Sequence, residues 1–407
     1  MSAERTTDKP RTLRHAPWAA RPLLKTLERV RDGQLTVNLP NGSRQTVGGE
    51  RPGPVGTLHL HRPLSMTRRV SLRGALGLAE SFIAGDWSAD NLAAALQVLA
   101  VNQPHFAGAH RGKTAARLLD RLRHLLRANS VRGSRRNIAY HYDLGNDFYR
   151  LWLDDTMTYS SAVFQSADED LPSAQARKYQ AMLDRLAAEP GDHILEIGCG
   201  WGGFASHAAR QGYRVTGITL SREQLSYARA RMVAEGLEDL VTLELRDYRH
   251  LDRQFDHIVS IEMFEAVGET YWPTYFDTLA RCLKPGGRAA LQVITIDASR
   301  FDHYRRNADF IQAYVFPGGM LPSVDVFDAH TEAAGLATVS RDFYGIDYAH
   351  TLRRWDEQVT AQTDAIRELG YDERFLRLWH YYLAYCEVGF RLGRTDVMQV
   401  ALQAPRA

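Results

Sequence analysis

The sequence predicts an α/β fold in which helices cover both faces of a parallel sheet, with a smaller domain of mixed structure ahead of it. Three observations support this prediction. Segments typical of strands and helices alternate from residue 172 to 295, a glycine-rich turn follows the first of those strands, and the charge of the chain changes sign after about residue 130. Such alternation is typical of parallel sheets, because a crossover between parallel strands usually needs a helix. We therefore expect two domains, residues 1–130 and 131–407.

The N-terminal domain is expected to combine short strands with helices. Its glycine- and proline-rich run 41–56 predicts a turn between strands. Residues 75–101 have the apolar periodicity of a helix, and Trp87 within them is an expected core residue. These features do not by themselves indicate a function.

The second domain contains the alternating series. We expect strands at 193–197, 213–218, 241–245, 257–261 and 288–295. We expect helices at 173–188, at 202–211, from Ser221 onward and at 271–283. Beyond residue 342 the chain is expected to be mainly helical, with its aromatic residues packed in a core: Trp379, Tyr381, Tyr382 and Phe390.

The two parts of the chain differ strongly in charge. Residues 1–136 contain 23 Lys and Arg against 9 Asp and Glu, and the remainder contains 27 against 39. Segment 111–136 is the most basic part, with Asp120 as its one acid. Such a segment is either a solvated helix face or a docking surface for an anionic partner, lipid headgroups or nucleic acid. Charge alone favours neither interpretation.

Cysteine usage and hydropathy indicate a cytoplasmic protein. Cys199, Cys282 and Cys386 have no paired spacing, which is typical of a reducing compartment and argues against a disulfide scaffold or a structural metal site. The first twenty residues lack the apolar core of a signal peptide. The longest mostly apolar stretch, 92–101, is shorter than the roughly 20 residues of a membrane-spanning helix.

A glycine-rich loop joins the first strand of the second domain to the next helix. Gly198, Gly200 and Gly202 permit positive φ and a close approach of the backbone to a ligand. A dinucleotide site would have G-x-G-x-x-G and an acid at the end of the second strand. This loop has G-x-G-x-G-G, and the second strand ends in Thr219, Leu220 and Ser221. A nicotinamide or flavin nucleotide is therefore disfavoured.

The polar residues around this loop favour S-adenosylmethionine instead. Glu196 and the loop would face its amino acid end, Thr219 and Gln224 its ribose, and Asp247 its adenine amino group. Tyr248 can cover the adenine face. The candidate cofactor residues near the three strand ends are Glu196, Gly198, Gly200, Gly202, Thr219, Leu220, Gln224, Asp247 and Tyr248.

Motifs over nearly the whole chain resemble one family, the cyclopropane-fatty-acyl-phospholipid synthases with the related mycolic acid methyltransferases. "GDWS" in the N-terminal domain is similar to the long members of this family. The motifs that carry the resemblance in the second domain are, in order, "NIAYHYDLGNDFYRLWLDDTMTYSSAVF", "ILEIGCGWGG", "VTGITLSREQ", "IEMFEAVG" and "FPGGMLPS". The resemblance implies a Rossmann-like class I S-adenosylmethionine-dependent methyltransferase domain.

The resemblance also implies a reaction and its partners. The cis double bond of a phospholipid acyl chain attacks the sulfonium methyl group, a cation forms on the chain, and a base removes a proton so that a ring closes. In this family the base is a bound bicarbonate ion. The acceptor is in the membrane, so the basic N-terminal domain would dock at the anionic bilayer surface, peripheral to its inner face. The sequence is also compatible with a homodimer.

The resemblance assigns positions of this sequence to the base site. Glu265, Ile294 and Tyr348 match three of the family's bicarbonate contacts, and Tyr159 and Ser160 match positions on the cofactor side. An ionised Glu265 without a partner would be costly in its apolar surroundings, which favours a functional role. The resemblance also places Tyr314 and Phe316 along the acyl channel.

Three positions of the base site depart from the family pattern. Ser161 replaces a Cys, Gln292 replaces a His, and Ala266 replaces a second His. Ser161 and Gln292 can still form hydrogen bonds to an anion, but neither supplies positive charge. The departures bear on ring closure more than on methyl transfer. If the cation loses a proton from a neighbouring chain carbon, the product is a methylene- or methyl-branched chain of the 10-methyl type, so both products are retained.

Two other classes of protein are alternatives. A nucleic-acid methyltransferase would use the basic segment to bind phosphates, but the chain has no base-modification motif of the "NPPY" type. A non-catalytic binder would explain Ser161 and Gln292 as signs of decay, but Glu265, Tyr348 and the glycine loop are retained.

Overall fold

The computed structural model of the protein describes residues 17–106, 144–166 and 168–406, which divide into two units. The first contains residues 17–106 together with Asp372–Val388, and the second contains the rest of the described chain. The expected boundary near residue 130 and the basic segment 111–136 lie outside the described residues. The first unit therefore includes a segment from far along the chain, which the sequence did not indicate.

The first unit is built on a four-stranded sheet with the strand order β2-β1-β3-β4. β1 pairs antiparallel with β2 and parallel with β3, and β4 pairs antiparallel with β3. The strands are β1 (Asp32–Asn38), β2 (Arg44–Gly48), β3 (Arg51–Leu60) and β4 (Trp87–Ala89). The helices are η1 (Trp18–Ala20), α1 (Arg21–Leu27), α2 (Pro63–Arg73), α3 (Ala75–Ile83), α4 (Leu92–Val101) and α5 (Gln103–Phe106).

Two expectations for this unit were wrong in detail. Run 41–56 is not only a turn, since β2 and six of the ten residues of β3 lie within it. Residues 75–101 are not one helix, because a turn with Gly85 at φ +73° and strand β4 separate α3 from α4. Trp87 is fully buried, as expected, and its Nε1 donates a hydrogen bond to Ser81 Oγ at 2.9 Å.

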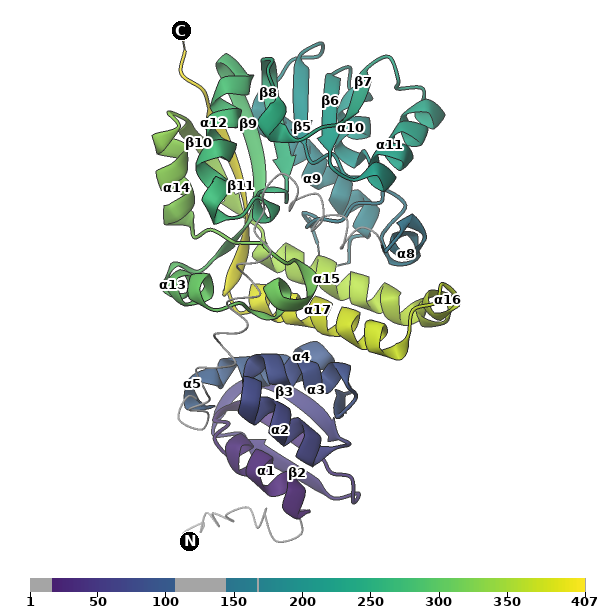
Figure 1. Ribbon diagram of the computed structural model, residues 1–407, viewed down its shortest axis with the longest axis vertical. Coiled ribbons are helices and arrows are strands. Elements are labelled where there is room, and N and C mark those ends of the chain that lie inside the picture. The colour runs from purple at the N-terminus through teal and green to yellow at the C-terminus, as the bar shows by residue number, and fades with distance from the viewer. Residues whose placement is uncertain (1–16, 107–143, 167, 407) are drawn as a thin grey trace, which may run out of the picture. The chain divides into compact units, whose positions relative to one another are not determined.

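The second unit contains a seven-stranded sheet with the strand order β10-β11-β9-β8-β5-β6-β7 (Figure 1). Five neighbouring strands are parallel: β5 (His193–Ile197), β6 (Arg214–Thr219), β7 (Val241–Leu245), β8 (Phe255–Ile261) and β9 (Leu283–Ile296). β11 (Thr395–Gln403) pairs antiparallel with both β9 and β10 (Ala337–Phe343). The α/β fold is therefore confirmed. The sheet is mixed rather than purely parallel, because β11 runs antiparallel to both of its neighbours. This strand lies in a tail that was expected to be mainly helical.

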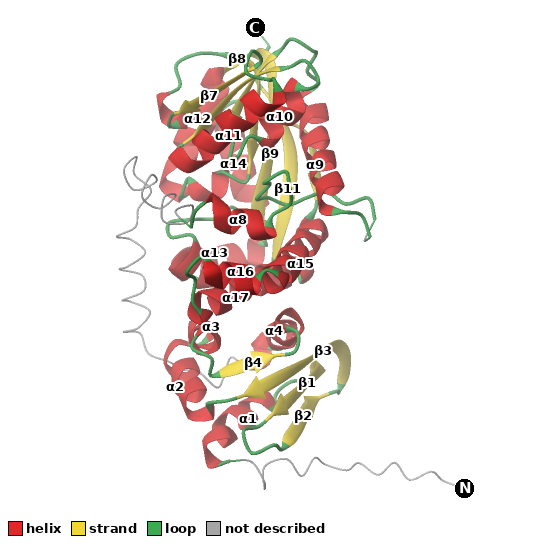
Figure 2. Cartoon of the chain, turned by 90° about the vertical axis from the view of Figure 1, so that its right-hand side faces the viewer, coloured by secondary structure: helices red, strands yellow, loops and turns green. Residues whose placement is uncertain are grey.

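Helices cover both faces of this sheet, as Figures 1 and 2 show. One core lies between the sheet and α9, α10 and α11, and it includes Ile194 of β5. The other lies between the sheet and α12 and α14, and it includes the neighbouring Leu195. Successive side chains of a strand point to opposite faces, so β5 contributes to both cores. The helices of the second unit are α8 (Asn146–Trp152), α9 (Leu171–Leu186), α10 (Gly203–Ala209), α11 (Arg222–Glu235), α12 (Trp272–Cys282), α13 (Ala298–Arg306), α14 (Val324–Ala333), α15 (Gly345–Ala361) and α16 (Thr363–Glu368). The remaining helix, α17 (Glu373–Arg391), belongs to the first unit over most of its length.

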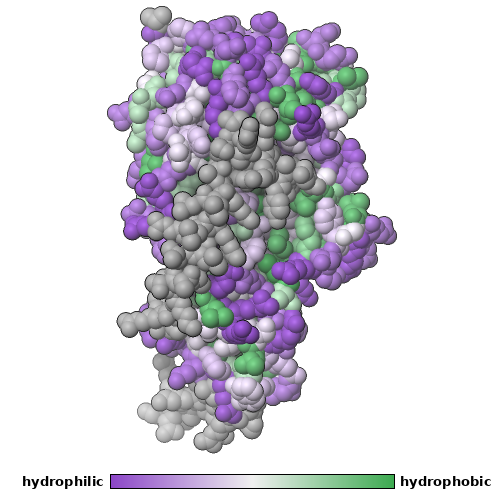
Figure 3. Space-filling model, in the orientation of Figure 1, coloured by the Kyte–Doolittle hydropathy of each residue, from purple (hydrophilic) through white to green (hydrophobic). Residues whose placement is uncertain are grey.

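The length and hydropathy of the described helices do not together indicate a membrane-spanning segment. Among the described residues, no helix is both long enough and apolar enough to cross a bilayer. The face seen in Figure 3 is mostly hydrophilic, with separate hydrophobic patches.

Candidate active site

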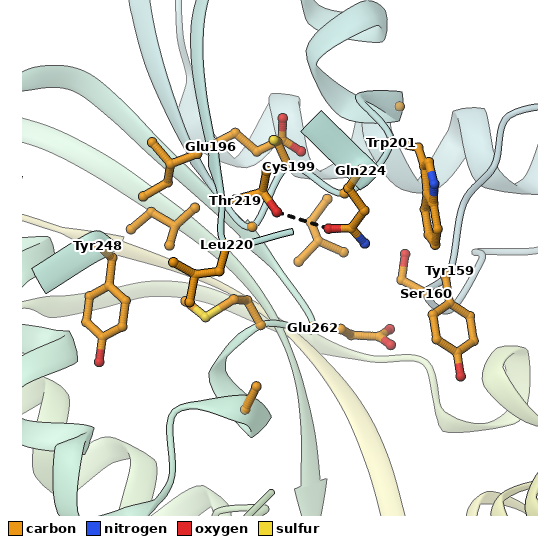
Figure 4. A pocket seen from close by; sticks show the side chains of 18 of the residues that line it. Tyr159, Ser160, Glu196, Cys199, Trp201, Thr219, Leu220, Gln224, Tyr248 and Glu262 are labelled. Carbon is orange, nitrogen blue, oxygen red and sulfur yellow. Dashed lines mark hydrogen bonds between the residues drawn. The ribbon is translucent and has the colours of Figure 1, made fainter. Parts of the chain in front are cut away.

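A pocket of the second unit lies where the parallel strands β5, β6 and β8 end. Residues that follow these strands line it, including the glycine loop after β5 and Thr219 and Leu220 at the end of β6 (Figure 4). Ligands of open α/β sheets bind at this edge, because the loops after the parallel strands converge there. The predicted site residues that line the pocket are Tyr159, Ser160, Glu196, Gly198, Gly200, Thr219, Leu220, Gln224 and Tyr248.

The loop after β5 requires glycine for two different reasons. Gly198, Gly200 and Gly202 have φ of +87°, +49° and +83°, which other residues adopt only with strain. Gly203 has no space for a side chain, because a Cβ there would lie 2.3 Å from Tyr179 Oη. Gly203 lines the pocket, whereas Gly202 packs against α11. The loop therefore holds its backbone close to whatever fills the pocket.

Glu196 is a buried carboxyl group at the carboxyl end of β5. It is 3% exposed, and burial raises its pKa to about 8, while Lys178 opposes that shift. Among the described residues, none forms a hydrogen bond with its buried Oε2. A buried acceptor without a partner is costly, so a cationic ligand group placed there would stabilise the site. The ammonium group of S-adenosylmethionine fits this position.

The end of β6 is organised by a short hydrogen-bond chain. Thr219 Oγ1 donates to Gln224 Oε1 at 3.0 Å, which orients the Gln224 amide at the pocket (Figure 4). Ser221 caps α11 by accepting from the backbone N–H of Gln224 at 3.2 Å. These contacts fix a hydroxyl and an amide group at the part of the pocket where the ribose is expected, and Leu220 lines the pocket beside them.

Tyr248 lines the pocket at the end away from Tyr159 and Trp201, as Figure 4 shows. Asp247, beside it, does not line the pocket, and its side chain is fully buried. Its Oδ1 and Oδ2 accept from Arg249 Nε at 2.9 Å and from an Arg249 terminal nitrogen at 2.7 Å. Its contact with adenine therefore stays a prediction.

The predicted base-site residues surround a carboxylate that the sequence analysis missed. Glu262 lines the pocket, and its Oε1 accepts from the backbone N–H of Ser161 at 2.8 Å and from Gln292 Nε2 at 2.7 Å. Its Oε2 accepts from Tyr348 Oη at 2.8 Å. Ser161, Gln292 and Tyr348 do not themselves line the pocket. Glu262 thus lies between these three residues and the pocket. The one feature of the sequence that could have indicated this carboxylate was its place three residues before Glu265.

The backbone at Glu262 is strained. Its φ is +49°, in the left-handed region that costs most residues about 1–2 kcal/mol. A hydrogen bond from its N–H to the carbonyl of Gln292, at 2.8 Å, holds this conformation. Strained residues are concentrated at functional sites, where the surrounding structure maintains them.

Glu265 and Ile294 lie behind this carboxylate rather than in the pocket lining. The carboxylate of Glu265 accepts a hydrogen bond from the backbone N–H of Ile294. Burial, and then the nearby charge of Glu262, raise the pKa of Glu265 to about 8. Its buried Oε2 has no hydrogen-bond partner among the described residues. Two neighbouring carboxyl groups in such a place repel each other when both are ionised, which favours a state in which only one of them is ionised.

Lys178 is a second residue that the sequence analysis missed. It is fully buried behind the pocket, and its Nζ donates to Ser160 Oγ at 2.7 Å. Burial lowers the pKa of Lys178 to about 7, although Glu262, Asp154 and Glu196 favour its charged form. Its position on α9, between Arg177 and Tyr179, gave no sign of this contact in the sequence.

Aromatic rings gather beside Glu262. Tyr159 lines the pocket and lies 5.3 Å from Trp355 between ring centroids, and Trp355 lies 6.0 Å from Tyr348. Tyr314 and Phe316, expected along an acyl channel, are half-buried and do not line this pocket. Of the three rings near Glu262, Tyr159 lines the pocket and can stabilise a cation there through its π face, while Trp355 and Tyr348 are buried beside it.

Comparisons with known proteins agree with these features. The model of the family described as mycolic acid cyclopropane synthetase matches residues 129–400. The chain is 40% identical over 368 residues to tuberculostearic acid methyltransferase UfaA1 of Mycobacterium tuberculosis, covering 85% of this chain and 83% of that one. It is 39% identical over 340 residues to cyclopropane-fatty-acyl-phospholipid synthase of Escherichia coli K12, covering 82% and 84%.

A solved structure shares the fold of the second unit. Mycolic acid cyclopropane synthase CmaA1, complexed with SAH and CTAB, superposes with a TM-score of 0.63 at 31% identity. The match covers 66% of this chain and 98% of that one. The predicted class I methyltransferase fold and the family resemblance are both confirmed.

Proposed function

The chain belongs to the mycolic acid cyclopropane synthetase family and is an S-adenosylmethionine-dependent lipid methyltransferase, and from this we propose that it adds one carbon to the cis double bond of an unsaturated phospholipid acyl chain. The observation that carries the proposal is one pocket with the glycine loop and Glu196 on one side and Glu262 on the other. The product is a cyclopropane or, as the alternative, a methylene- or methyl-branched chain. The 40% identity to tuberculostearic acid methyltransferase UfaA1 supports the methylene- or methyl-branched chain as the alternative product.

The chain's own residues would bind and orient the reactants. When bound, S-adenosylmethionine supplies an electrophilic methyl group on a sulfonium centre. Glu196 would hold its ammonium group, Thr219 and Gln224 its ribose, and Tyr248 its adenine face. Tyr159 would offer a π face to the cation that forms on the acyl chain. These assignments remain proposals.

We also propose that the basic N-terminal domain brings the enzyme to an anionic membrane surface. The excess of Lys and Arg over residues 1–136 supports this, because anionic headgroups attract clustered basic residues. A nucleic-acid methyltransferase is not favoured, because the relatives named above act on lipids.

The proposed function is tested by mass and by proton NMR. The protein is incubated with S-adenosylmethionine and vesicles of cis-unsaturated phospholipid, with and without anionic headgroups. We expect the acyl chains to gain one CH₂, faster on the anionic vesicles, with no gain on saturated chains. Upfield cyclopropane protons or vinylidene protons in the extracted methyl esters then identify the product. Folded protein that binds S-adenosylmethionine but adds no carbon would contradict the proposal.

Cofactor binding is expected to release a proton at neutral pH. At pH 7, Glu196 is mostly protonated in the free protein, because its pKa is about 8. Pairing with the ammonium group favours the carboxylate, so close to one proton should leave on binding. Isothermal titration calorimetry in buffers of different ionisation enthalpy measures this number. The Glu196→Gln variant should release none, and an unchanged release in that variant would assign the proton to another group.

A further inference from the structure

We propose that Glu262 is the base of the reaction, its carboxylate holding the position that the resemblance gives to a bound bicarbonate ion. This inference deepens the proposed function and rests on it. Of the described residues that line the pocket, Glu196 and Glu262 alone carry carboxyl groups. Glu196 lies at the glycine loop, on the cofactor's side, so Glu262 is the carboxylate left to accept a proton from the substrate.

The donors that would bind bicarbonate are already used by Glu262. The Ser161 N–H, the Gln292 amide and the Tyr348 hydroxyl donate to its two oxygens at 2.7–2.8 Å. The remaining contacts of the resemblance, Glu265 and the Ile294 N–H, are paired with each other. A bicarbonate ion brought here would face a carboxylate and find its donors occupied. Bicarbonate therefore does not fit this site.

The donors are held in place by their own partners. Gln292 Oε1 accepts from Gln399 Nε2 at 2.9 Å, and Gln399 Oε1 accepts from Arg185 Nε at 3.2 Å. The amide nitrogen of Gln292 must then point at Glu262. Ser161 contributes its backbone N–H, while its hydroxyl donates to the Ala162 carbonyl at 3.0 Å. A Ser can therefore replace the family's Cys at this position, because the group that donates to Glu262 is the backbone N–H and not the side chain.

Two further observations agree with Glu262 acting as the proton acceptor. Glu262 keeps a left-handed backbone conformation, which glycine would adopt without strain, so the side chain is present despite that strain. Burial raises the pKa of Glu262 above its ordinary value, and the hydrogen bonds from Ser161, Gln292 and Tyr348 partly oppose the shift. A carboxylate of raised pKa is a stronger base.

The proposed step balances with Glu262 as proton acceptor. The π pair of the alkene forms a bond to the methyl carbon, and the C–S bond breaks with its electrons left on sulfur, giving a neutral thioether. The adjacent chain carbon is then a cation. Glu262 takes a proton from the added methyl group, and the C–H pair closes the third bond of a cyclopropane. If a 1,2-hydride shift first moves the cation to the carbon that carries the new methyl group, the same pair forms a C=CH₂ double bond, which gives a methylene-branched chain. Glu262 afterwards returns the proton to solvent.

The test compares the dependence of activity on bicarbonate in three forms of the protein. The unsubstituted protein should be equally active, within about twofold, in bicarbonate-depleted buffer and with millimolar bicarbonate. Glu262→Gln keeps the shape, and its amide oxygen can still accept from the Ser161 N–H and the Gln292 amide, while its NH₂ group faces the Tyr348 oxygen. The amide cannot accept the proton, so activity should fall at least about 100-fold in both buffers. Glu262→Gly suits the backbone and frees the three donors, so activity should fall equally without bicarbonate and recover at least tenfold with it.

Matched measurements separate the possible failures. S-adenosylmethionine affinity should change less than about threefold in either variant, and Glu269→Gln, a charge removal outside the pocket, should leave activity unchanged. Bicarbonate dependence of the unsubstituted protein, or more than a tenth of its activity in Glu262→Gln, would overturn the role of Glu262 and leave the proposed function standing. An unsubstituted protein that binds the cofactor but modifies no acyl chain would overturn both.

Discussion

Replacing Glu196 by Gln is expected to weaken S-adenosylmethionine binding by about 100-fold or more. Removing one partner of a buried charge pair typically costs about 3–5 kcal/mol, because the other charge is left uncompensated. Glu196 is 3% exposed, and no described residue forms a hydrogen bond with its Oε2. The ligand's ammonium group would therefore lose its buried counter-charge. Isothermal titration calorimetry of the variant measures the loss.

The same variant should fold as well as the parent at pH 7. With a pKa of about 8, Glu196 is mostly neutral in the free protein at that pH, and Gln resembles the neutral acid in shape. Glu269→Gln is the matched control, because Glu269 pairs with Arg305 and neither residue lines the pocket. Its cofactor affinity should be unchanged. Binding by Glu196→Gln within threefold of the parent would show that Glu196 does not hold the ammonium group.

Replacing Gly203 by Ala is expected to lower the free energy of unfolding by about 2–3 kcal/mol, the cost of overpacking a well-packed core. The new Cβ would lie 2.3 Å from Tyr179 Oη and 2.9 Å from Cζ of the same ring. Tyr179 is buried, and its hydroxyl is 2.8 Å from Thr158 Oγ1, so the ring has little room to move. Because Gly203 lines the pocket, the shift should weaken cofactor binding as well. Urea denaturation and calorimetry measure the two effects.

Two variants show whether the clash is the cause. Gly236→Ala places a Cβ where no described heavy atom lies within 4 Å, at φ +67°, so only the backbone strain of about 1–2 kcal/mol is expected. In the Tyr179→Phe background the closest atom is removed, and Gly203→Ala should cost less than in the parent. An equal cost in both backgrounds would mean that the hydroxyl is not what limits the space.

Much of the second unit's fold could be predicted from local sequence. Strands β5 and β7 have the predicted bounds, and Ser221 caps α11 as its position before the helix suggests. Strand β11 was missed because a short, buried, apolar run is equally compatible with a helix, and only its pairing with β9 and β10 identifies it as a strand. The break between α3 and α4 was missed for a similar reason, since the strand that interrupts them exists through its pairing with β3.

The sequence by itself determined the family, the cofactor loop and the side chains that follow each parallel strand, because these depend on residues close together in the chain. Only the tertiary structure decided how the base site is arranged. Glu262 receives its hydrogen bonds from residues 161, 292 and 348, which come from separate segments of the second unit. Likewise, the pairing of Asp247 with Arg249 is set by side-chain conformation, not by spacing. A carboxylate acquires its hydrogen-bond partners and its pKa from the groups that surround it after folding. The role of Glu262 could therefore not be predicted from its position in the sequence.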